Sequence, residues 1–592
     1  MGRLGKYIKP HVFYILVTLA IKFVGTYAEL WIPTLMETML DDKVPQGDLK
    51  QIYIYGGLMV LCAVLCLVLN ITANRMTAFS SGKITRAIRH DLFNKLQHLS
   101  ARQMDVLTVP SAESRLTSDT YNINQMLTRI QRMGIRAPIL LIGGLIMMVQ
   151  MDWVLSLVLV ALLPIIAIVV YFVTKKSLPM YTKQQTVLDR VVRVLQENIT
   201  GIRVIKALSK TEYEKERFEG VNKELSDVSQ RAGMVTSITG PVNSVVLNLG
   251  LTAVVVVGAF RVNDGLMKAG VIIASLQYFT MILNAMMGIT RIFVMWSKGE
   301  ASAKRVADVL DLPEDLIVEK PSSLGEGETE QVVTDEGEDI PAPTADKPPH
   351  IEFRDVSFSY TGVGKNIDNL SFRLEHGQTL GILGGTGSGK STILNLLLRL
   401  YDADQGQVLL DGRDIRTIEY DTLREKFGIV FQNDFITEGD IAHNIRFFRD
   451  ISDEDLELAA QHAQAEFIAE KEGGMAAEVV VRGNNLSGGQ KQRLLIARAL
   501  AARPEILVLD DASSALDYKT DSNLRKALRE NYRGTTTVLV TQRVSSLRHA
   551  DLILVLSDGC VIGAGNHEAL MTTCEEYRII ANSQMYGGKE GA

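Results

Sequence analysis

A glycine-rich octapeptide at residues 384–391 constrains the fold of this chain most strongly, because it fits the pattern G-x4-G-K-[ST]. Residues 380–383 before it are apolar and β-like, and residues 391–400 after it have a helical pattern, so strand, loop and helix come in the required order. Such a loop surrounds phosphate groups with backbone N–H groups and with the positive end of a helix. The octapeptide therefore predicts an α/β nucleotide-binding domain.

Each side chain of this loop has an expected role. Lys390 is predicted to reach the β and γ phosphates of ATP, and Ser391 to ligate Mg²⁺. ATP and Mg²⁺ are the two predicted cofactors. The residues predicted to bind ATP here are Gly384, Gly385, Thr386, Gly387, Ser388, Gly389, Lys390, Ser391 and Thr392.

The second half of the predicted nucleotide site is the stretch ILVLDDASSALD at residues 506–517. Its apolar run closes on two adjacent carboxylates, which is typical of a buried parallel strand that presents an acid at its carboxyl end. Asp510 is therefore predicted to face the bound metal ion.

The bulk composition indicates several domains and a membrane. The chain has 592 residues, 47% hydrophobic residues and a mean hydropathy of +0.12. Its net charge of −6 gives no basic surplus, so we expect no nucleic-acid partner. The four cysteines have neither disulfide nor zinc spacing and are predicted to be packing residues.

Six apolar runs are long enough to cross a hydrocarbon layer of ~30 Å. Basic residues concentrate at the N-terminus, between runs two and three, between runs four and five, and after run six, so both termini are expected to be cytoplasmic. The N-terminal apolar segment has no evident cleavage site and is interpreted as a retained anchor. The runs are residues 12–33, 52–73, 133–150, 153–173, 238–260 and 271–296.

The two internal cytoplasmic connections, residues 74–132 and 174–238, are long, amphipathic and mostly free of helix breakers. They are predicted to extend the membrane helices into the cytoplasm, and their chain reversals are expected at residues 109–120 and 210–220. Much of their charge is simply a solvated helix face.

Ionisable residues inside the predicted spans are functional candidates, because intramembrane charge usually faces a bundle interior or a water-filled cavity. The alternative for Lys22 and Arg291 is that they snorkel to the interface, and Glu29 lies near the end of a span. Asn248 and Asn284 are their polar companions.

The predicted domains are a transmembrane domain at residues 1–311, an acidic disordered linker at 312–348 and a nucleotide-binding domain at 349–592. The linker prediction rests on residues 321–346, which hold eight Asp or Glu and no Lys or Arg.

From residue 351 onward the sequence resembles the nucleotide-binding domain of an ATP-binding cassette (ABC) transporter. The resemblance rests on a complete LSGGQ signature and on an SALD sequence that matches the family's D-loop. It implies that Tyr360 stacks on adenine and that Gln432 reaches Mg²⁺ or the attacking water. The signature residues are Leu486, Ser487, Gly488, Gly489 and Gln490, and the D-loop residues are Ser514, Ala515, Leu516 and Asp517.

Six spans before one such domain resemble a half-transporter of the type IV exporter class. The predicted fold class is thus an α-helical membrane domain, with six transmembrane helices and long cytoplasmic extensions, fused to an α/β P-loop ABC domain. The resemblance implies that the two reversals are coupling helices that dock on nucleotide-binding domains. It also implies two half-transporters, because each ATP lies between the phosphate loop of one chain and the signature of the other.

Two residues depart from the family pattern, and both belong to the same composite site. Asp511 stands where the family has the glutamate that acts as general base, and the shorter side chain withdraws the carboxylate by about 1 Å, which can cost about 100-fold in rate. Gln542 stands where the family has the switch histidine. Glutamine hydrogen-bonds a phosphate but carries neither a proton nor a positive charge.

The intact signature serves the opposite site, so the pattern resembles the degenerate-site subunit of heterodimeric bacterial exporters. The predicted partners are a second, non-identical ABC half-transporter, the lipid of a bacterial cytoplasmic membrane, and a hydrophobic or amphipathic substrate that is drug-like or a lipid. Alternatives are a homodimer with slow Asp-assisted hydrolysis, an engineered Glu-to-Asp change, and an ATP-gated channel. A soluble ABC ATPase of DNA repair or translation is a further class, which the predicted spans oppose.

Overall fold

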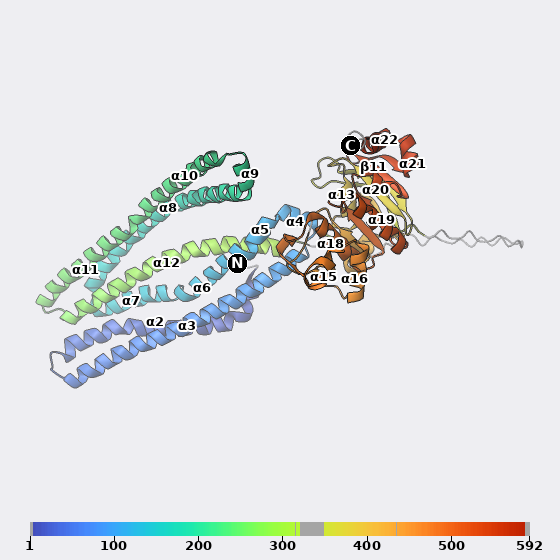
Figure 1. Cartoon of the computed structure of the whole chain (residues 1–592). Helices are drawn as coiled ribbons and strands as arrows, with labels where there is room; N and C mark the ends of the chain where they lie inside the picture. Colours follow the sequence, from blue (N-terminus) through green and yellow to red (C-terminus); the bar gives the residue numbers. More distant parts are fainter. Residues whose placement is uncertain (1–3, 314, 320–347, 434, 587–592) are drawn as a thin grey trace, which may run out of the picture. The chain divides into compact units, whose positions relative to one another are not determined.

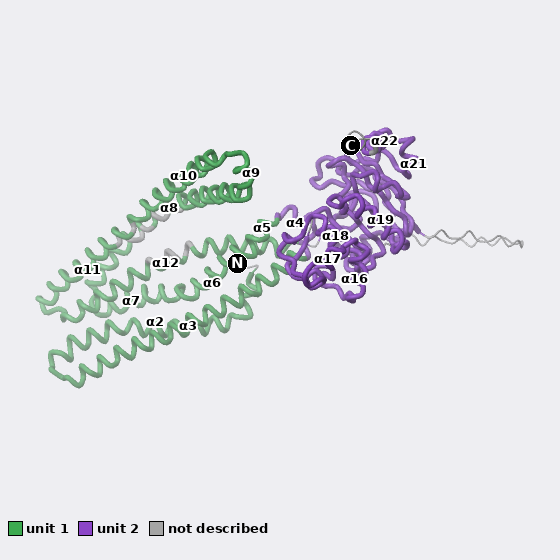
Figure 2. Tube along the Cα trace, in the orientation of Figure 1, with its two compact units in different colours: residues 1–97, 109–312 green, residues 98–108, 313–592 purple. Residues whose placement is uncertain are grey.

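The structure is a computed structural model that describes residues 4–313, 315–319, 348–433 and 435–586. It divides into two compact units (Figure 2). The first unit comprises residues 1–97 and 109–312, and the second comprises residues 98–108 and 313–592. The acidic stretch at residues 321–346, on which the linker prediction rests, lies outside the described residues.

Long helices that run side by side form the first unit (Figure 1). Helix α2 packs against α3, α8 against α10, and α12 against both α6 and α7. The helices are α1 (Gly5–Ile8), α2 (Val12–Thr38), α3 (Leu49–Gln97), α5 (Val109–Ser114), α6 (Thr120–Met133), α7 (Arg136–Met151), α8 (Trp153–Thr200), α9 (Ile202–Ala207), α10 (Thr211–Ser237), α11 (Thr239–Asn263) and α12 (Ala269–Leu310).

Five helical stretches in the described part of the chain are long and apolar enough to cross a membrane. The predicted fourth span, residues 153–173, lies in α8, where Trp153–Ile165 is the apolar stretch among the described residues. Six spans are therefore not confirmed. The five stretches are Gly5–Lys43, Leu49–Gln97, Val109–Met151, Thr211–Asn263 and Ala269–Met286.

The predicted helical extensions are present, but both predicted reversals are misplaced. Residues 109–120 and 210–220 are almost entirely helical, and the breaks come earlier, between α3 and α5 and between α8 and α10. The first break is set by Ser100, whose hydroxyl and the side chain of Gln103 form a capping box that starts a new short helix. Thr108 and Ser209, with positive φ of 64° and 53°, end the two breaks.

Two sheets form the framework of the second unit. An antiparallel sheet has the order β2-β1-β4-β5, and a mostly parallel sheet has the order β12-β11-β3-β10-β9-β6. The strands are β1 (Ile351–Phe358), β2 (Ile367–Leu374), β3 (Thr379–Gly384), β4 (Gln405–Leu410), β5 (Arg413–Asp414), β6 (Phe427–Val430), β7 (Gly439–Asp440), β8 (Glu478–Val479), β9 (Ile506–Asp510), β10 (Thr536–Val540), β11 (Leu552–Ser557) and β12 (Cys560–Gly565).

Helices cover the parallel sheet and enclose its apolar strands. Strand β9 is buried along its whole length, as its continuous apolar run predicts. The helices are α4 (Ala101–Leu107), α13 (Lys390–Leu397), α14 (Tyr420–Glu425), α15 (Ile441–Arg446), α16 (Asp453–His462), α17 (Phe467–Glu470), α18 (Gly488–Ala501), α19 (Tyr518–Asn531), α20 (Val544–Leu547), α21 (His567–Thr573) and α22 (Glu575–Tyr586).

Strand order places the two halves of the predicted nucleotide site at one edge. Strand β10 pairs in parallel with β3 on one side and with β9 on the other. The carboxyl ends of β3 and β9 therefore lie at the same edge, one strand apart. The predicted strands at 380–383 and 506–510 are confirmed, and the helix after the loop is α13, shorter than the predicted 391–400.

Helix α4 belongs to the second unit, although it follows the long helix α3 of the first. The hydroxyl of Tyr401 donates to Asp105 Oδ2 at 2.6 Å, and that of Ser100 donates to Asp315 Oδ2 at 2.6 Å. Gln103 Nε2 donates to the carbonyl of Pro313 at 2.7 Å. This short helix is thus docked on the nucleotide-binding domain by side-chain hydrogen bonds.

Candidate ATP-binding and hydrolysis site

The phosphate loop connects β3 to α13 and needs glycine at two positions for local reasons. Gly387 and Gly389 have φ of 83° and 101°. A Cβ on Gly389 would come within 2.7 Å of the carbonyl oxygen of Asn366. The left-handed backbone and this close approach leave no room for a side chain. The loop therefore delivers bare N–H groups to the start of α13, where an anion binds.

Lys390 folds back onto the loop. Its Nζ donates to the carbonyls of Gly384 at 2.9 Å and Gly385 at 2.5 Å. Burial lowers the pKa of Lys390, while the charges of Asp510 and Asp511 oppose that shift. The ammonium group is thus held inside the loop by weak neutral acceptors, which phosphate oxygens would replace with charged ones.

Ser391 and Asp510 form the metal-binding half of the site. Ser391 Oγ donates to Asp510 Oδ2 at 3.2 Å, so α13 and β9 place the two predicted oxygen ligands together. Burial raises the pKa of Asp510, and the neighbouring charge of Asp511 adds to the rise. Mg²⁺ prefers oxygen ligands, so a hydroxyl beside a carboxylate suits it. Its positive charge would offset the repulsion between the carboxylates of Asp510 and Asp511.

Asp511 occupies the position of the expected general base. The chain bends sharply there, because Asp511 has φ of 51° and its N–H donates to the carbonyl of Val540 at 2.9 Å. Burial raises the pKa of Asp511, and Arg543 lowers it in part. Asp tolerates the left-handed region better than most residues with a side chain. The backbone of this turn is therefore well suited to the residue present.

Gln584 of α22 fixes the loop that carries the predicted switch residue. Its Nε2 donates to the carbonyl of Gln542 at 2.8 Å, and its Oε1 accepts from the N–H of Val544 at 2.9 Å. Gln542 itself is exposed. Sequence reasoning missed Gln584, because no local pattern links a residue of the last helix to a turn forty-two positions earlier.

The signature begins helix α18. The Ser487 hydroxyl accepts from the N–H of Gln490 at 3.3 Å, and the Gln490 side chain accepts from the N–H of Ser487 at 3.0 Å, which completes a capping box. Leu486 is buried beneath it. The motif is therefore an ordered start of an α-helix, the kind of helix end at which anions bind.

Gln492, one turn into α18, braces the signature helix against the D-loop. Its Nε2 donates to Ser514 Oγ at 2.9 Å, and its Oε1 accepts from the N–H of Ala515 at 2.9 Å. A Cβ on Gly489 would lie 3.1 Å from the carbonyl oxygen of Ala515, so the two segments pack closely. Gln492 lies two residues after the signature, and sequence reasoning gave it no role in bracing the D-loop.

The D-loop links these contacts to the catalytic turn. Ser514 Oγ donates to the carbonyl of Asp511 at 2.9 Å, and Arg543 donates to the carbonyl of Ser514 at 3.2 Å. Asp517 ends the loop as the N-cap of α19. Ser487 hydrogen-bonds within the signature, and Lys390 hydrogen-bonds within the phosphate loop.

The two remaining predicted ATP-binding residues are Tyr360 and Gln432. Tyr360 packs edge-on against Phe358 and Tyr401, with ring centroids 4.9 and 5.0 Å away, and its hydroxyl accepts from Asn395 Nδ2 at 2.9 Å. Its ring is therefore anchored to α13. Gln432 is exposed just after β6.

The first unit holds a charged cluster and two open grooves. Lys22 is 3% exposed and donates to Asn74 Oδ1 at 3.3 Å, so it faces the helix bundle. Glu29 pairs with Arg136 at 2.8 Å. The side chain of Arg291 lies outside the described part of the chain.

Each groove lies between two helices. One, of about 720 Å³, lies between α11 and α12 and is lined by Asn248, Met281 and Asn284 among others. The second, of about 590 Å³, lies between α2 and α7 and contains Tyr27, Trp31 and Met147. The predicted polar companions Asn248 and Asn284 thus share one groove.

Comparison with known families matches both units. A model of the ABC transporter transmembrane region matches residues 13–286, and a model of the ABC transporter family matches residues 367–514. In the solved structures, an ATP-bound bacterial Atm1-family ABC exporter superimposes with a TM-score of 0.78 at 22% identity and covers 98% of each chain. That likeness concerns the fold.

Curated relatives extend over the full length. An uncharacterised ABC transporter ATP-binding protein of Mycobacterium tuberculosis is 30% identical over 603 residues, covering 100% of this chain and 99% of the relative. YfiB of Bacillus subtilis, also an uncharacterised ABC transporter ATP-binding protein, is 30% identical over 599 residues and 100% of both chains. A fatty acid ABC transporter ATP-binding/permease protein of Mycobacterium bovis is 31% identical over 502 residues, which are 84% of this chain and 76% of that protein.

Proposed function

The chain belongs to the ABC transporter family, with a transmembrane region and an ATP-binding domain in one polypeptide, and we propose that it is the degenerate-site half of a heterodimeric exporter. The ABC domain implies an ATPase coupled to transport across a membrane. The partner is a second, non-identical half-transporter, and the setting is the cytoplasmic membrane of a bacterium.

The observation that carries this proposal is the contrast inside one domain between Asp511 with Gln542 and the intact signature. Both departures fall on the composite site built on this chain's phosphate loop. The signature at Ser487 to Gln490 has the full family sequence and forms a capping box at the start of α18. A chain that had merely lost function would have no reason to keep the half that serves its partner.

The residues of this chain's own site are assigned to binding. Lys390 and the N–H groups of the loop hold the phosphates, while Ser391 and Asp510 hold Mg²⁺, which neutralises phosphate charge when bound. The Asp511 side chain is one methylene shorter than the glutamate that positions the attacking water in the family. Gln542 has no proton to transfer. ATP at this site therefore acts as a clamp that keeps two domains together.

The partner's site performs the turnover. There the signature of this chain, with Ser487 and the start of α18, lies against ATP held by the partner's phosphate loop. Gln492 joins that signature to the D-loop and, through Ser514, to the turn at Asp511. Occupancy of one site is thereby coupled to the geometry of the other.

The proposed substrate is a hydrophobic or amphipathic small molecule, either drug-like or a lipid. Both grooves of the first unit are mainly apolar with a few polar groups, as a site for such molecules requires. Arg136 precedes Pro138, the first residue of α7 that lines the α2–α7 groove, by two positions. Arg136 forms an ion pair with Glu29. The fatty acid transporter among the relatives is compatible with an amphipathic cargo.

Transport against a gradient distinguishes the exporter from an ATP-gated channel. The complex is placed in sealed inverted vesicles, and accumulation of a fluorescent amphiphile is followed with Mg²⁺ and ATP. We expect the internal concentration to exceed the external one, and we expect the Ser487→Ala complex to fail. A channel would only equilibrate the two sides, and that result would contradict the proposal.

A further inference from the structure

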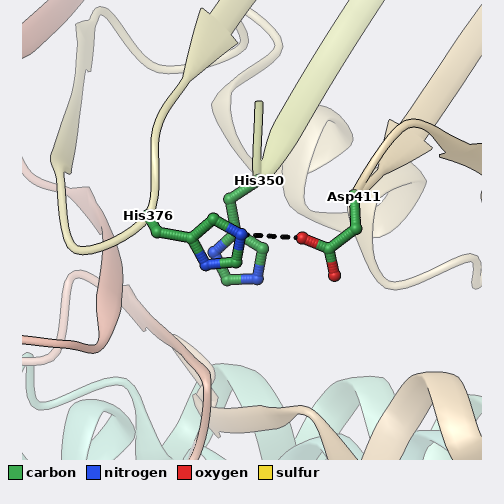
Figure 3. Close-up of side chains that lie close together, drawn as sticks. All are labelled: His350, His376 and Asp411. Atoms are coloured by element: carbon green, nitrogen blue, oxygen red, sulfur yellow. Dashed lines mark ion pairs between the residues drawn. The ribbon is translucent and has the colours of Figure 1, made fainter. Parts of the chain in front are cut away.

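The register of the antiparallel sheet gathers three metal-binding side chains at one point. Ile351 of β1 pairs with Leu374 of β2 and with Leu410 of β4. The residues just beyond these partners must therefore meet at the same end of the sheet. They include His350 before β1, His376 in the turn after β2, and Asp411 in the turn after β4 (Figure 3).

His350 is buried and has one ring nitrogen without a partner. His350 is 1% exposed. Its Nδ1 lies 2.6 Å from Thr536 Oγ1, within hydrogen-bond distance. Its Nε2 has no hydrogen-bond partner. A buried polar atom that is left unpaired is destabilising, so a ligand at this nitrogen would be favourable. The Thr536 bond holds the ring through Nδ1 and leaves Nε2 as its free ligand atom.

His376 and Asp411 supply the adjustable part of the cluster. His376 Nε2 lies 2.8 Å from Asp411 Oδ1, and the side chains are 56% and 37% exposed. One ligand atom from each of the three residues lies within 4.8 Å of the others. Asp411 Oδ2 is also 4.0 Å from Lys426 Nζ, which in turn pairs with Glu505.

We propose that His350, His376 and Asp411 form a binding site for a divalent transition-metal ion of the zinc type. Two imidazoles and one carboxylate are ligands that Zn²⁺ binds readily, whereas Mg²⁺ and Ca²⁺ select all-oxygen sites. Solvent completes the coordination. The site lies in the second unit and uses none of the residues that hold ATP.

The stacked rings define the movement that binding requires. The two imidazoles are parallel within 11° and their centroids are 3.8 Å apart. Since a metal ion lies in the plane of each imidazole that binds it, His376 must swing out of the stack. Ligand atoms around one zinc ion are ~3.3 Å apart. The exposed side chains of His376 and Asp411 can close that gap, while His350 stays fixed by Thr536.

The position of the cluster indicates what a bound ion would do. His376 stands three residues before β3, and Thr536 begins β10, so the cluster is at the edge of the parallel sheet opposite the phosphate loop. His350 precedes β1 and Asp411 follows β4 of the antiparallel sheet, whereas His376 precedes β3 of the parallel sheet. A bound ion would therefore join the ends of the two sheets and stabilise the domain without entering the reaction.

The test is metal binding to untagged full-length chain that is purified in detergent, stripped with a chelator and kept free of nucleotide. Zn²⁺ alone is bound in equilibrium dialysis, and Co²⁺ is used as the spectroscopic probe. We expect the wild type to bind one ion per chain. The His376→Ala variant should bind no ion or bind it at least ~10-fold more weakly, and its Co²⁺ d–d absorption band should be lost. Asp411→Asn should behave in the same way.

The control is His549→Ala, which removes an exposed histidine of the same unit. Zn²⁺ should raise the melting temperature of the wild type and of His549→Ala, and leave that of His376→Ala unchanged. Equal Zn²⁺ stoichiometry and affinity in the wild type and His376→Ala would overturn the proposal. The same conclusion follows if the wild type binds no Zn²⁺.

Discussion

Two groups of ATP-site motifs in the second unit differ in how closely they match the family pattern. On the proposed assignment, the half at Asp511 and Gln542 lacks the glutamate and the histidine of the family pattern, whereas the half at Ser487 to Gln490 keeps the full LSGGQ sequence. Both are equally well built. Strand β9 is buried, Gln584 fixes the switch loop by two hydrogen bonds, and the signature keeps its capping box.

Under the proposed function, this comparison describes a site that has lost its chemistry and kept its fold. The changed atoms are the terminal groups of two side chains, and the backbone around them is held by other residues. Asp511 and the Gln542 amide stand where the family has a longer carboxylate and an imidazole, while Lys390 Nζ bonds to the loop carbonyls and Ser391 Oγ bonds to Asp510. The proposed function assigns binding to Lys390, Ser391 and Asp510, and the loss of hydrolysis to Asp511 and Gln542.

The largest predicted effect comes from the complete half. Ser487→Ala in the complex should lower ATP turnover about 100-fold, because one hydrogen-bond donor to developing phosphate charge is lost. Steady-state ATPase activity measures this. Ser452→Ala is the matched control, since Ser452 caps α16 in the same way through the N–H of Asp455 and lies outside the motifs. A Ser487→Ala complex that keeps most of its activity would break the comparison.

The second prediction concerns Asp510, whose folded-state pKa is raised by burial. The folded state therefore holds its proton more tightly than the unfolded chain, so metal-free stability is lost as pH rises above the unfolded pKa and through the folded one.

Asp510→Asn should remove this loss. Without Mg²⁺ at pH 7, the variant should melt a few degrees higher than the wild type, because ~1 kcal/mol moves the midpoint of a domain this size by about 2–4 °C. The difference should shrink as pH falls through the folded pKa toward the unfolded one. Added Mg²⁺ and ATP should stabilise only the wild type. A variant that melts lower at pH 7 would contradict this.

Gln584→Leu should loosen the switch loop without changing its sequence. Loss of two hydrogen bonds to the backbone of Gln542 and Val544 should destabilise the domain by about 1–2 kcal/mol. Thermal unfolding measures this. Ser583→Ala is the control, because Ser583 bonds only within α22. Turnover of the complex should change little, since this loop serves the degenerate site.

The smallest predicted effect is the one that would be large in an ordinary ATPase. Asp511→Glu combined with Gln542→His should change turnover of the complex by less than about twofold, because the partner's site sets the rate. The same pair restores the family pattern, although Glu tolerates φ of 51° less well than Asp. A tenfold or larger gain would show that this site limits the rate.

Much of the nucleotide site could be predicted because its residues are contiguous in sequence. The order of strand, loop and helix predicted the positions of Lys390 and Ser391. The apolar run predicted β9 and the position of Asp510 at its end. The residues whose roles were missed act across the fold. Gln584 and Gln492 have polar side chains with no local pattern, and only the packing of α22 and α18 gives them partners.

The helical unit was predicted less evenly. Apolar length identified most of the long helices, but it did not locate the reversals, because charge and hydropathy vary little along the extensions. A usable signal was present at Ser100 and Gln103, whose spacing matches a capping box. The Glu29–Arg136 pair joins two helices distant in sequence and had no signal of its own.

The ATPase activity of this chain alone, purified in detergent, tests the central claim most directly. A homodimer would contain two composite sites that both have Asp511 and Gln542, so we predict turnover about 100-fold below that of the complex with its partner. Mixing with the partner should restore the rate, and this chain's Ser487→Ala variant should prevent the restoration. Brisk, cooperative hydrolysis by the chain alone would contradict the account.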